Sequence, residues 1–114
     1  MTHSIKTFFS TWAEPNSDAI RASVTAGIRY QDPRTPEPLV GPEAVASYVA
    51  MFSEHAPGAS AEVVAQSETG SFVRATVAFR MADGKEQHGQ YFVDLSEDGR
   101  MQRLIGFAGL GAPE

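Results

Sequence analysis

The sequence predicts an α+β domain in which three helices, all in the first half of the chain, pack on an antiparallel sheet. Two observations lead to this prediction. Apolar residues recur at helical spacing in the first half, whereas from Ser60 onward they alternate with polar residues at the period of a strand. Short glycine-containing turns separate the alternating runs, and such turns join antiparallel neighbours. The predicted order is helix, helix, strand, helix and then four consecutive strands.

Length and composition limit the class of protein. The 114 residues are enough for a single domain, 1–114, and a composition of 42% hydrophobic and 20% charged residues is that of an ordinary globule. The chain has no cysteine, which excludes disulfides, thiolate nucleophiles and zinc–thiolate sites. A net charge of −5 opposes nucleic acid as the main partner. Residues 1–6 lack a secretory pattern and no apolar run approaches the roughly 18 residues of a membrane span, so we expect a cytoplasmic protein without a membrane partner.

The first two predicted helices lie close together in the sequence. The first follows Thr2 and is stopped by Pro15, and its inward stripe is Ile5, Phe8, Phe9 and Trp12. The second is short, begins at a cap formed by Asn16 or Ser17, and is expected to end at Gly27. Its inward residues are Ile20 and Val24.

The third predicted helix follows a short strand and a stiff loop. The strand covers Ile28 to Asp32, and the loop over 33–42 holds four prolines, which fix the backbone in an extended form. Gly41 and Pro42 are typical of a helix start. The inward stripe of this helix is Val45, Tyr48, Val49 and Phe52. The four later strands are expected at about 60–68, 71–81, 86–95 and 100–108.

The later strands have large apolar side chains on both faces. In the third of the four runs, Phe92 shares a face with His88 and Gln90, whereas Tyr91 and Val93 lie on the other. Three helices cover only one face, so we expect a homodimer through the other sheet face, the alternative being scattered surface apolar residues. We expect His88 and Gln90 on the helix-facing side, where polar groups among apolar walls are typical of a small-molecule cavity.

Two segments resemble a known family. Tyr30-Gln31-Asp32-Pro33 is followed nine residues after Asp32 by Gly41-Pro42-Glu43-Ala44-Val45, and the chain closes with Asp98-Gly99-Arg100-Met101-Gln102-Arg103-Leu104-Ile105-Gly106-Phe107. Together with the element order, these segments resemble the nuclear transport factor 2-like superfamily, in particular its SnoaL-like polyketide cyclases and ketosteroid isomerases. The resemblance implies a cone-shaped fold, with a curved sheet wrapped around helices, a deep pocket at the open end and usually a dimer.

The same resemblance assigns roles to three residues. Asp32 stands where the ketosteroid isomerases keep their general-base aspartate. Their oxyanion hole uses a tyrosine on the first helix and a protonated aspartic acid on a late strand. Phe8 occupies the tyrosine position and cannot donate a hydrogen bond, whereas Gln90 lies near the second position and can. The resemblance therefore implies a base with half of an oxyanion hole.

The residues themselves leave two interpretations open for each candidate. Asp32, facing an apolar cavity, would be a desolvated base for proton transfer; alternatively, an Asp-Pro turn uses the carboxylate to accept backbone N–H groups. His88 would be a second acid–base group or an orienting donor; alternatively, it pairs with Glu86. The candidate pocket residues are core residues first: Phe8, Trp12, Tyr30, Tyr48, Phe52, Phe79 and Phe92. The hydroxyls of Tyr30 and Tyr48 are possible substitutes for the missing donor.

These observations favour a small-molecule-binding protein that acts as a cofactor-independent isomerase- or cyclase-type enzyme. Asp32 would move a proton next to a carbonyl of an apolar ligand, with Gln90 and His88 stabilising the enolate. No histidine pair has metal-ligand spacing and no phosphate-binding loop is present, so we expect neither a metal nor a cofactor. The alternatives are a binding module without proton chemistry and a protein-interaction domain that uses the open sheet face. The sequence identifies no particular ligand.

Overall fold

The computed structural model describes residues 3–109, over which the chain forms three helices and one six-stranded sheet. The elements are α1 (His3–Ser10), α2 (Ser17–Ser23), β1 (Val24–Gln31), β2 (Leu39–Val40), α3 (Pro42–His55), β3 (Ser60–Thr69), β4 (Phe72–Arg80), β5 (Glu86–Leu95) and β6 (Met101–Ala108). The α+β class and the helix-rich first half agree with the sequence prediction.

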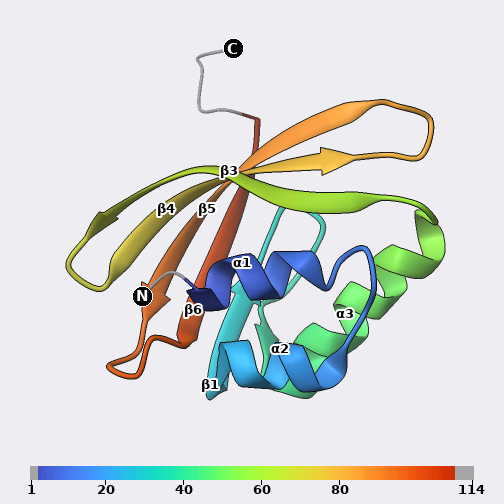
Figure 1. Ribbon diagram of the computed structural model, residues 1–114. Coiled ribbons are helices and arrows are strands. Elements are labelled where there is room, and N and C mark those ends of the chain that lie inside the picture. Colours follow the sequence, from blue (N-terminus) through green and yellow to red (C-terminus); the bar gives the residue numbers. More distant parts are fainter. Residues whose placement is uncertain (1–2, 110–114) are drawn as a thin grey trace.

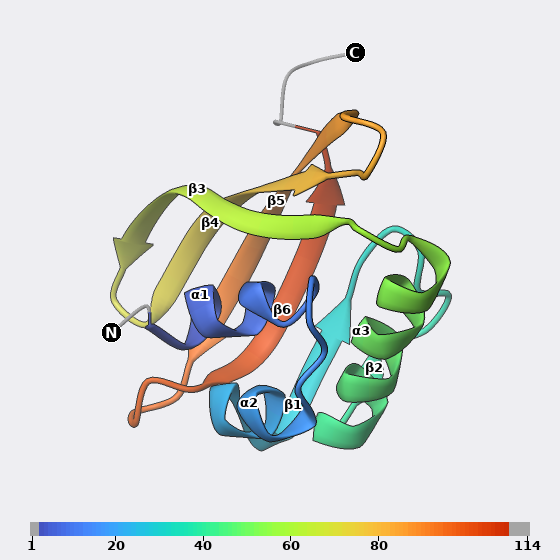
Figure 2. The same ribbon diagram turned by 45° about the vertical axis from the view of Figure 1, so that its right-hand side comes forward.

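The sheet bends around the helices. Its strand order is β2-β1-β6-β5-β4-β3, and β1 runs parallel to β6 while the other neighbours are antiparallel. Figure 1 and Figure 2 show α1 lying across the inside of this curve, with α2 and α3 beside β1. The predicted cone-shaped arrangement is therefore present, and its far side, the outer face, carries no helix within residues 3–109.

Three local predictions are wrong. Helix α1 ends at Ser10, well before Pro15, so Trp12 lies just beyond it. The second helix ends at Ser23 rather than Gly27, because Val24 already has extended backbone angles (φ −126°, ψ 157°) and pairs with Met101 of β6. β-branched residues such as Val24 favour a strand once a neighbouring strand is available. The proline-rich loop also contains a short strand, β2, which pairs with Arg29 and Tyr30 of β1. Other predictions hold: Asn16 caps α2 by accepting the Ala19 N–H at 3.1 Å.

Aromatic rings fill the inside of the curve. Trp12 packs edge-to-face against Phe52 with ring centroids 4.8 Å apart, and Phe9 packs similarly against Tyr91 at 4.9 Å. The buried rings of this cluster are Phe8, Phe9, Trp12, Tyr30, Phe52, Phe79 and Tyr91. Pairs of this geometry contribute about 0.5–1.5 kcal/mol beyond the area they bury. The inside of the fold is thus mainly core.

The faces of β5 are the reverse of the prediction. Tyr91 is buried with its strand neighbours Gly89, Val93 and Leu95, whereas Phe92 is 47% exposed on the outer face. Gly106 of β6 makes room for the inward ring, because a Cβ there would lie 2.5 Å from Tyr91 Cε2. The expectation that His88, Gln90 and Phe92 face the helices is therefore wrong. Strand alternation places all three side chains outward.

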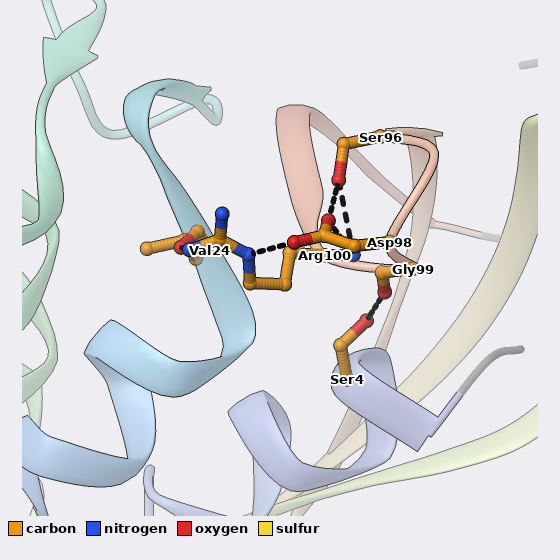
Figure 3. Close-up of polar contacts among 6 residues, drawn as sticks. All are labelled: Ser4, Val24, Ser96, Asp98, Gly99 and Arg100. Atoms are coloured by element: carbon orange, nitrogen blue, oxygen red, sulfur yellow. Dashed lines mark hydrogen bonds and ion pairs between the residues drawn. The ribbon is translucent and has the colours of Figure 1, made fainter.

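The turn between β5 and β6 joins the start of the chain to the sheet, as Figure 3 shows. Ser4 Oγ donates a hydrogen bond to Gly99 O at 2.7 Å, and Arg100 Nη1 donates to Val24 O at 3.3 Å. Arg100 Nε also pairs with Asp98 Oδ2 at 2.8 Å. Helix α1 and the first residue of β1 are in this way held to the same hairpin.

Candidate functional site

Asp32 follows the last residue of β1 and is only 8% exposed. Its Oδ2 accepts hydrogen bonds from the hydroxyls of Tyr30 and Tyr48, each at 2.6 Å. Its Oδ1 accepts the backbone N–H of Arg34 at 2.8 Å. A buried carboxylate needs such donors, because its charge is otherwise expensive to remove from water. Three elements of the fold therefore meet at this carboxylate: the end of β1, the loop after it, and α3.

The loop sequence explains how Asp32 is held. Thr35 N–H donates to Asp32 O at 3.1 Å, closing a turn that has Pro33 at its second position. The Thr35 hydroxyl lies 3.1 Å from both the backbone N and the backbone O of Asp32. The backbone-accepting interpretation of Asp32 is therefore confirmed through the Arg34 N–H. The carboxylate nevertheless also faces the tyrosine hydroxyls, so the turn and the buried position coexist.

Three tyrosines near Asp32 have raised phenol pKa values. Burial is the main cause for each of Tyr30, Tyr48 and Tyr91. For Tyr48, the hydrogen bond to Asp32 and the charge of that carboxylate raise the pKa further. The hydroxyl of Tyr91 interacts with that of Tyr30 and extends the cluster toward β5. All three phenols therefore remain protonated donors at neutral pH.

Two hollows adjoin the carboxylate. The smaller, of about 150 Å³, is lined by Asp32, Pro33, Arg34, Phe79, Gln87, His88, Gly89, Tyr91, Phe107 and Ala108. The larger, of about 640 Å³, is lined by Arg34, Tyr48, Met51, Phe52, His55, Ala56, Met81 and Gln87. Arg34 and Gln87 line both, so these two side chains stand between the hollows. The two tyrosines that bind Asp32 differ in access, since Tyr48 is half-buried and Tyr30 is fully buried.

Two side chains of this part of the fold, Arg34 and Trp12, carry donors without a polar partner in the described part of the chain. The Arg34 guanidinium lies 5.7 Å from the centre of the Phe52 ring, and it forms no ion pair within residues 3–109. Trp12 Nε1 is buried and has no hydrogen-bond partner in the described part of the chain. An unpaired buried donor costs about 1–3 kcal/mol. Because Trp12 is buried and lines neither hollow, this donor is a feature of the core and not of the hollows.

The structure brings together some of the predicted site residues and separates others. Asp32, Tyr30 and Tyr48 share hydrogen bonds. The candidate pocket residues Phe52 and Phe79 line one hollow each, whereas Phe8 and Trp12 belong to the buried core and line neither. Phe92 lies on the outer face, and the expectation that it lines this pocket is wrong.

The two polar candidates on β5 also point outward. Gln90 accepts a hydrogen bond from the Thr76 hydroxyl at 3.1 Å, on the side of the sheet away from Asp32. His88 Nε2 lies 3.3 Å from Glu86 Oε2, as its alternative interpretation predicts, although His88 also borders the smaller hollow. An oxyanion donor from Gln90, as the resemblance implies, is not available at Asp32 in this arrangement.

Sequence reasoning missed three residues of the site: Arg34, Gln87 and Tyr91. Arg34 had a local signal, because it directly follows the Asp-Pro pair that positions the carboxylate. Gln87 and Tyr91 depended on the face of β5, which the alternation of that strand left ambiguous. Within residues 3–109, no group of three or more His, Cys, Asp or Glu side chains is placed to hold a metal ion. None of the helices described here is long and apolar enough to cross a membrane.

Known structures share this architecture. A proposed isomerase of the SnoaL-like family, from Agrobacterium tumefaciens, superimposes with a TM-score of 0.83 at 20% identity. The match covers 95% of this chain and 96% of that one. A protein with a ketosteroid isomerase-like fold from Catenulispora acidiphila, solved in complex with trimethylamine, gives 0.80 at 11% identity, with 94% and 85% covered. A proposed SnoaL-like polyketide cyclase from Jannaschia gives 0.77 at 16% identity, with 92% and 82% covered.

At these identities the structural matches show the fold alone. No curated protein sequence matches the chain at a significant level. The sequence profile of the SnoaL-like domain does match, and it spans residues 5–104, from α1 through most of β6. That span includes Asp32, Tyr48 and the whole segment between them. The chain therefore belongs to the SnoaL-like domain family, a branch of the nuclear transport factor 2-like superfamily.

Proposed function

We propose that this protein binds a small apolar molecule bearing a carbonyl group and moves a proton on the carbon next to that carbonyl, with Asp32 as the base and without a cofactor. The observation that carries the proposal is the buried Asp32 carboxylate, held by two tyrosine hydroxyls at the border of a hollow. Buried carboxylates at cavity walls are suited to general acid–base work.

The two carboxylate oxygens of Asp32 have different roles in this proposal. Oδ2 already accepts from two hydroxyls, whereas Oδ1 accepts only the Arg34 N–H. Each carboxylate oxygen has about two lone-pair sites, so Oδ1 retains room for one more hydrogen. The ligand's C–H bond would break toward Oδ1, its electron pair would move to the carbonyl oxygen as an enolate, and the proton would return to carbon from Asp32. The tyrosine donors would hold the carboxylate in place throughout.

Family membership supports a reaction of this type. The related structures are proposed to be an isomerase and polyketide cyclases, and an isomerase that acts on a ketone uses a carboxylate base beside the carbonyl. The complex of the Catenulispora protein with trimethylamine is a precedent for a small organic ligand on this fold.

Hydrogen–deuterium exchange on cyclohexanone tests the proposal directly. In deuterated buffer, proton NMR follows the loss of the hydrogens next to the carbonyl, and no second substrate is needed. We expect exchange faster than in buffer alone, and a loss of at least about 100-fold in the enzymatic rate for Asp32→Asn. An equal rate for the wild-type protein and a folded Asp32→Asn variant would remove Asp32 from the chemistry.

A matched control separates the role of Asp32 from a general effect of charge. Asp94 lies on the outer face and accepts hydrogen bonds from Ser71 and Gln102 at 3.0 and 3.1 Å. Asp94→Asn removes the same charge far from the hollows, so its exchange rate should equal that of the wild-type protein. Circular dichroism of each variant checks that the fold is retained. Asp32→Glu, which keeps a carboxylate but displaces it, should retain part of the exchange activity.

A binding module without proton chemistry is the second candidate. One observation favours it: within residues 3–109, the hydrogen bonds of the Asp32 carboxylate go to β1, the β1–β2 loop and α3 and hold these elements together, as those of a purely structural residue would. In that case cyclohexanone would bind without exchange, and Asp32→Asn would lower stability without lowering affinity. Exchange and binding measured on the same samples distinguish the two candidates.

A further inference from the structure

The larger hollow has an unusual charge for this protein. The chain carries a net charge of −5, yet the described residues that line this hollow include no aspartate or glutamate. Its ionisable lining residues are Arg34, His55 and Tyr48. His55 Nδ1 lies 2.8 Å from Met51 O and therefore donates to it, which leaves Nε2 directed elsewhere. The larger hollow is therefore lined by basic side chains and by no acidic one, on a protein whose net charge is negative.

Arg34 is available to bind an anion. Like Arg29, Arg74 and Arg103, Arg34 forms no ion pair within residues 3–109, and of these four arginines it is the one that lines the two hollows. Its guanidinium instead lies over the Phe52 ring at the border of both hollows. A guanidinium fork presents paired N–H donors that match a carboxylate, and stacking on a ring keeps it oriented.

The charge of Arg34 also reaches the donors around Asp32. It lowers the pKa of the phenols of Tyr48 and Tyr91, opposing the larger effect of burial. The backbone of Arg34 binds Asp32 Oδ1, so the base and the cation belong to one rigid turn. They nevertheless form no ion pair with each other in the described chain, and the guanidinium remains free for a ligand.

We propose that the ligand of this site is a small ketone that also carries a carboxylate, which Arg34 binds at the border of the two hollows while the carbonyl end lies at Asp32. This inference rests on the proposed function for the role of Asp32, but the carboxylate contact is independent of catalysis. The apolar side chains of Met51, Phe52 and Met81 line the larger hollow on the other side of Arg34, where the rest of a larger ligand would lie. Gln87, which lines both hollows, would contact the ligand between its charged and its carbonyl ends.

A matched pair of probes tests the ligand class. The probes are 3-oxocyclohexane-1-carboxylate and its methyl ester, which differ in charge and share the ketone ring. Titration followed by NMR should show the acid binding the wild-type protein at least about tenfold more tightly than the ester. Arg34→Gln should remove this preference, and Arg34→Lys, which keeps the charge but loses the fork, should retain part of it.

The control variant is Arg74→Gln. Arg74 is exposed on the outer face and, like Arg34, forms no ion pair within residues 3–109. Its substitution changes the net charge equally, so a preference for the acid that is due only to overall charge would fall in both variants. We expect the preference to survive Arg74→Gln unchanged.

The outcomes separate this inference from the proposed function. Asp32→Asn should abolish exchange yet keep the preference for the acid. Absence of exchange together with a preference that depends on Arg34 would remove the proposed chemistry and retain the ligand class. Exchange of both probes, bound with equal affinity, would retain the proposed chemistry and remove the ligand class. A preference that survives Arg34→Gln, or no binding of the acid by the wild-type protein, overturns the inference.

Discussion

The Tyr48 hydroxyl donates a hydrogen bond to Asp32 Oδ2 at 2.6 Å, across 16 residues of sequence. This contact joins the first half of α3 to the loop that follows β1. The second tyrosine on the same oxygen, Tyr30, comes from β1 itself. The carboxylate is therefore the point at which α3 and β1 are connected, and its orientation depends on both.

Removing the Tyr48 hydroxyl should weaken this connection. Tyr48→Phe keeps the ring and deletes one of two hydroxyl donors to Asp32 Oδ2. Hydrogen bonds to charged groups contribute about 1.5–3 kcal/mol, and Tyr48 is half-buried, so we expect a loss of about 1–2 kcal/mol in the free energy of unfolding. Urea denaturation measures it. An unchanged free energy would mean that solvent replaces the lost donor completely.

Gly106 should tolerate no side chain. A Cβ at this position would lie 2.5 Å from Tyr91 Cε2, so Gly106→Ala must displace the ring from the core at a cost of about 1–3 kcal/mol. Gly27 in β1 is the matched control, because a Cβ there meets nothing within 4 Å. Thermal unfolding should show a clear loss for Gly106→Ala and little change for Gly27→Ala. Equal stabilities would contradict the close packing of Tyr91.

Stability should fall in acid partly through Asp98. A hydrogen bond from the Ser96 hydroxyl, followed by the contacts with Arg100, lowers the pKa of Asp98 below its ordinary value of 3.8. A carboxyl group with a lowered folded-state pKa stabilises the fold above its unfolded pKa, and this contribution is lost as pH falls through the folded pKa. Asp98→Asn should therefore flatten the loss of stability below about pH 4. Parallel curves for the wild-type protein and the variant would contradict this expectation.

The outer face of the sheet should mediate dimer formation. Three exposed aromatic rings lie on it, Phe72, Phe92 and Phe107, and the last two pack edge-to-face at 5.6 Å. A groove of about 670 Å³ also crosses this face at Phe72 and Phe92. Exposed apolar patches of this kind are typical of interfaces, and a two-fold dimer would cover the patch on both copies.

Light scattering on a sizing column tests the dimer. We expect a dimer for the wild-type protein and a monomer for Phe92→Asp, since a charge at the centre of the patch would be buried without a partner. Val40→Asp is the control, because Val40 is also exposed but lies in β2 at the far edge of the sheet. A wild-type monomer at micromolar concentration would rule the dimer out.

The sequence by itself determined the class of fold, most of the element boundaries and the position of Asp32. These properties depend on local patterns. The stripe of α3, the glycine turns of the later strands and the Asp-Pro pair after β1 are each encoded within a few neighbouring residues. Even there, a local pattern was misleading at Val24, whose strand conformation depends on pairing with Met101.

Only the tertiary structure decided which side chains surround Asp32. The choice between the two faces of β5 rests on Gly106, a residue of the next strand that makes room for the ring of Tyr91. That choice turns Gln90 and Phe92 outward and brings Gln87 and Tyr91 to the smaller hollow. The physical reason is that alternation along a strand defines two faces but not which one is buried. The buried face is selected by the space and the partners that distant segments provide.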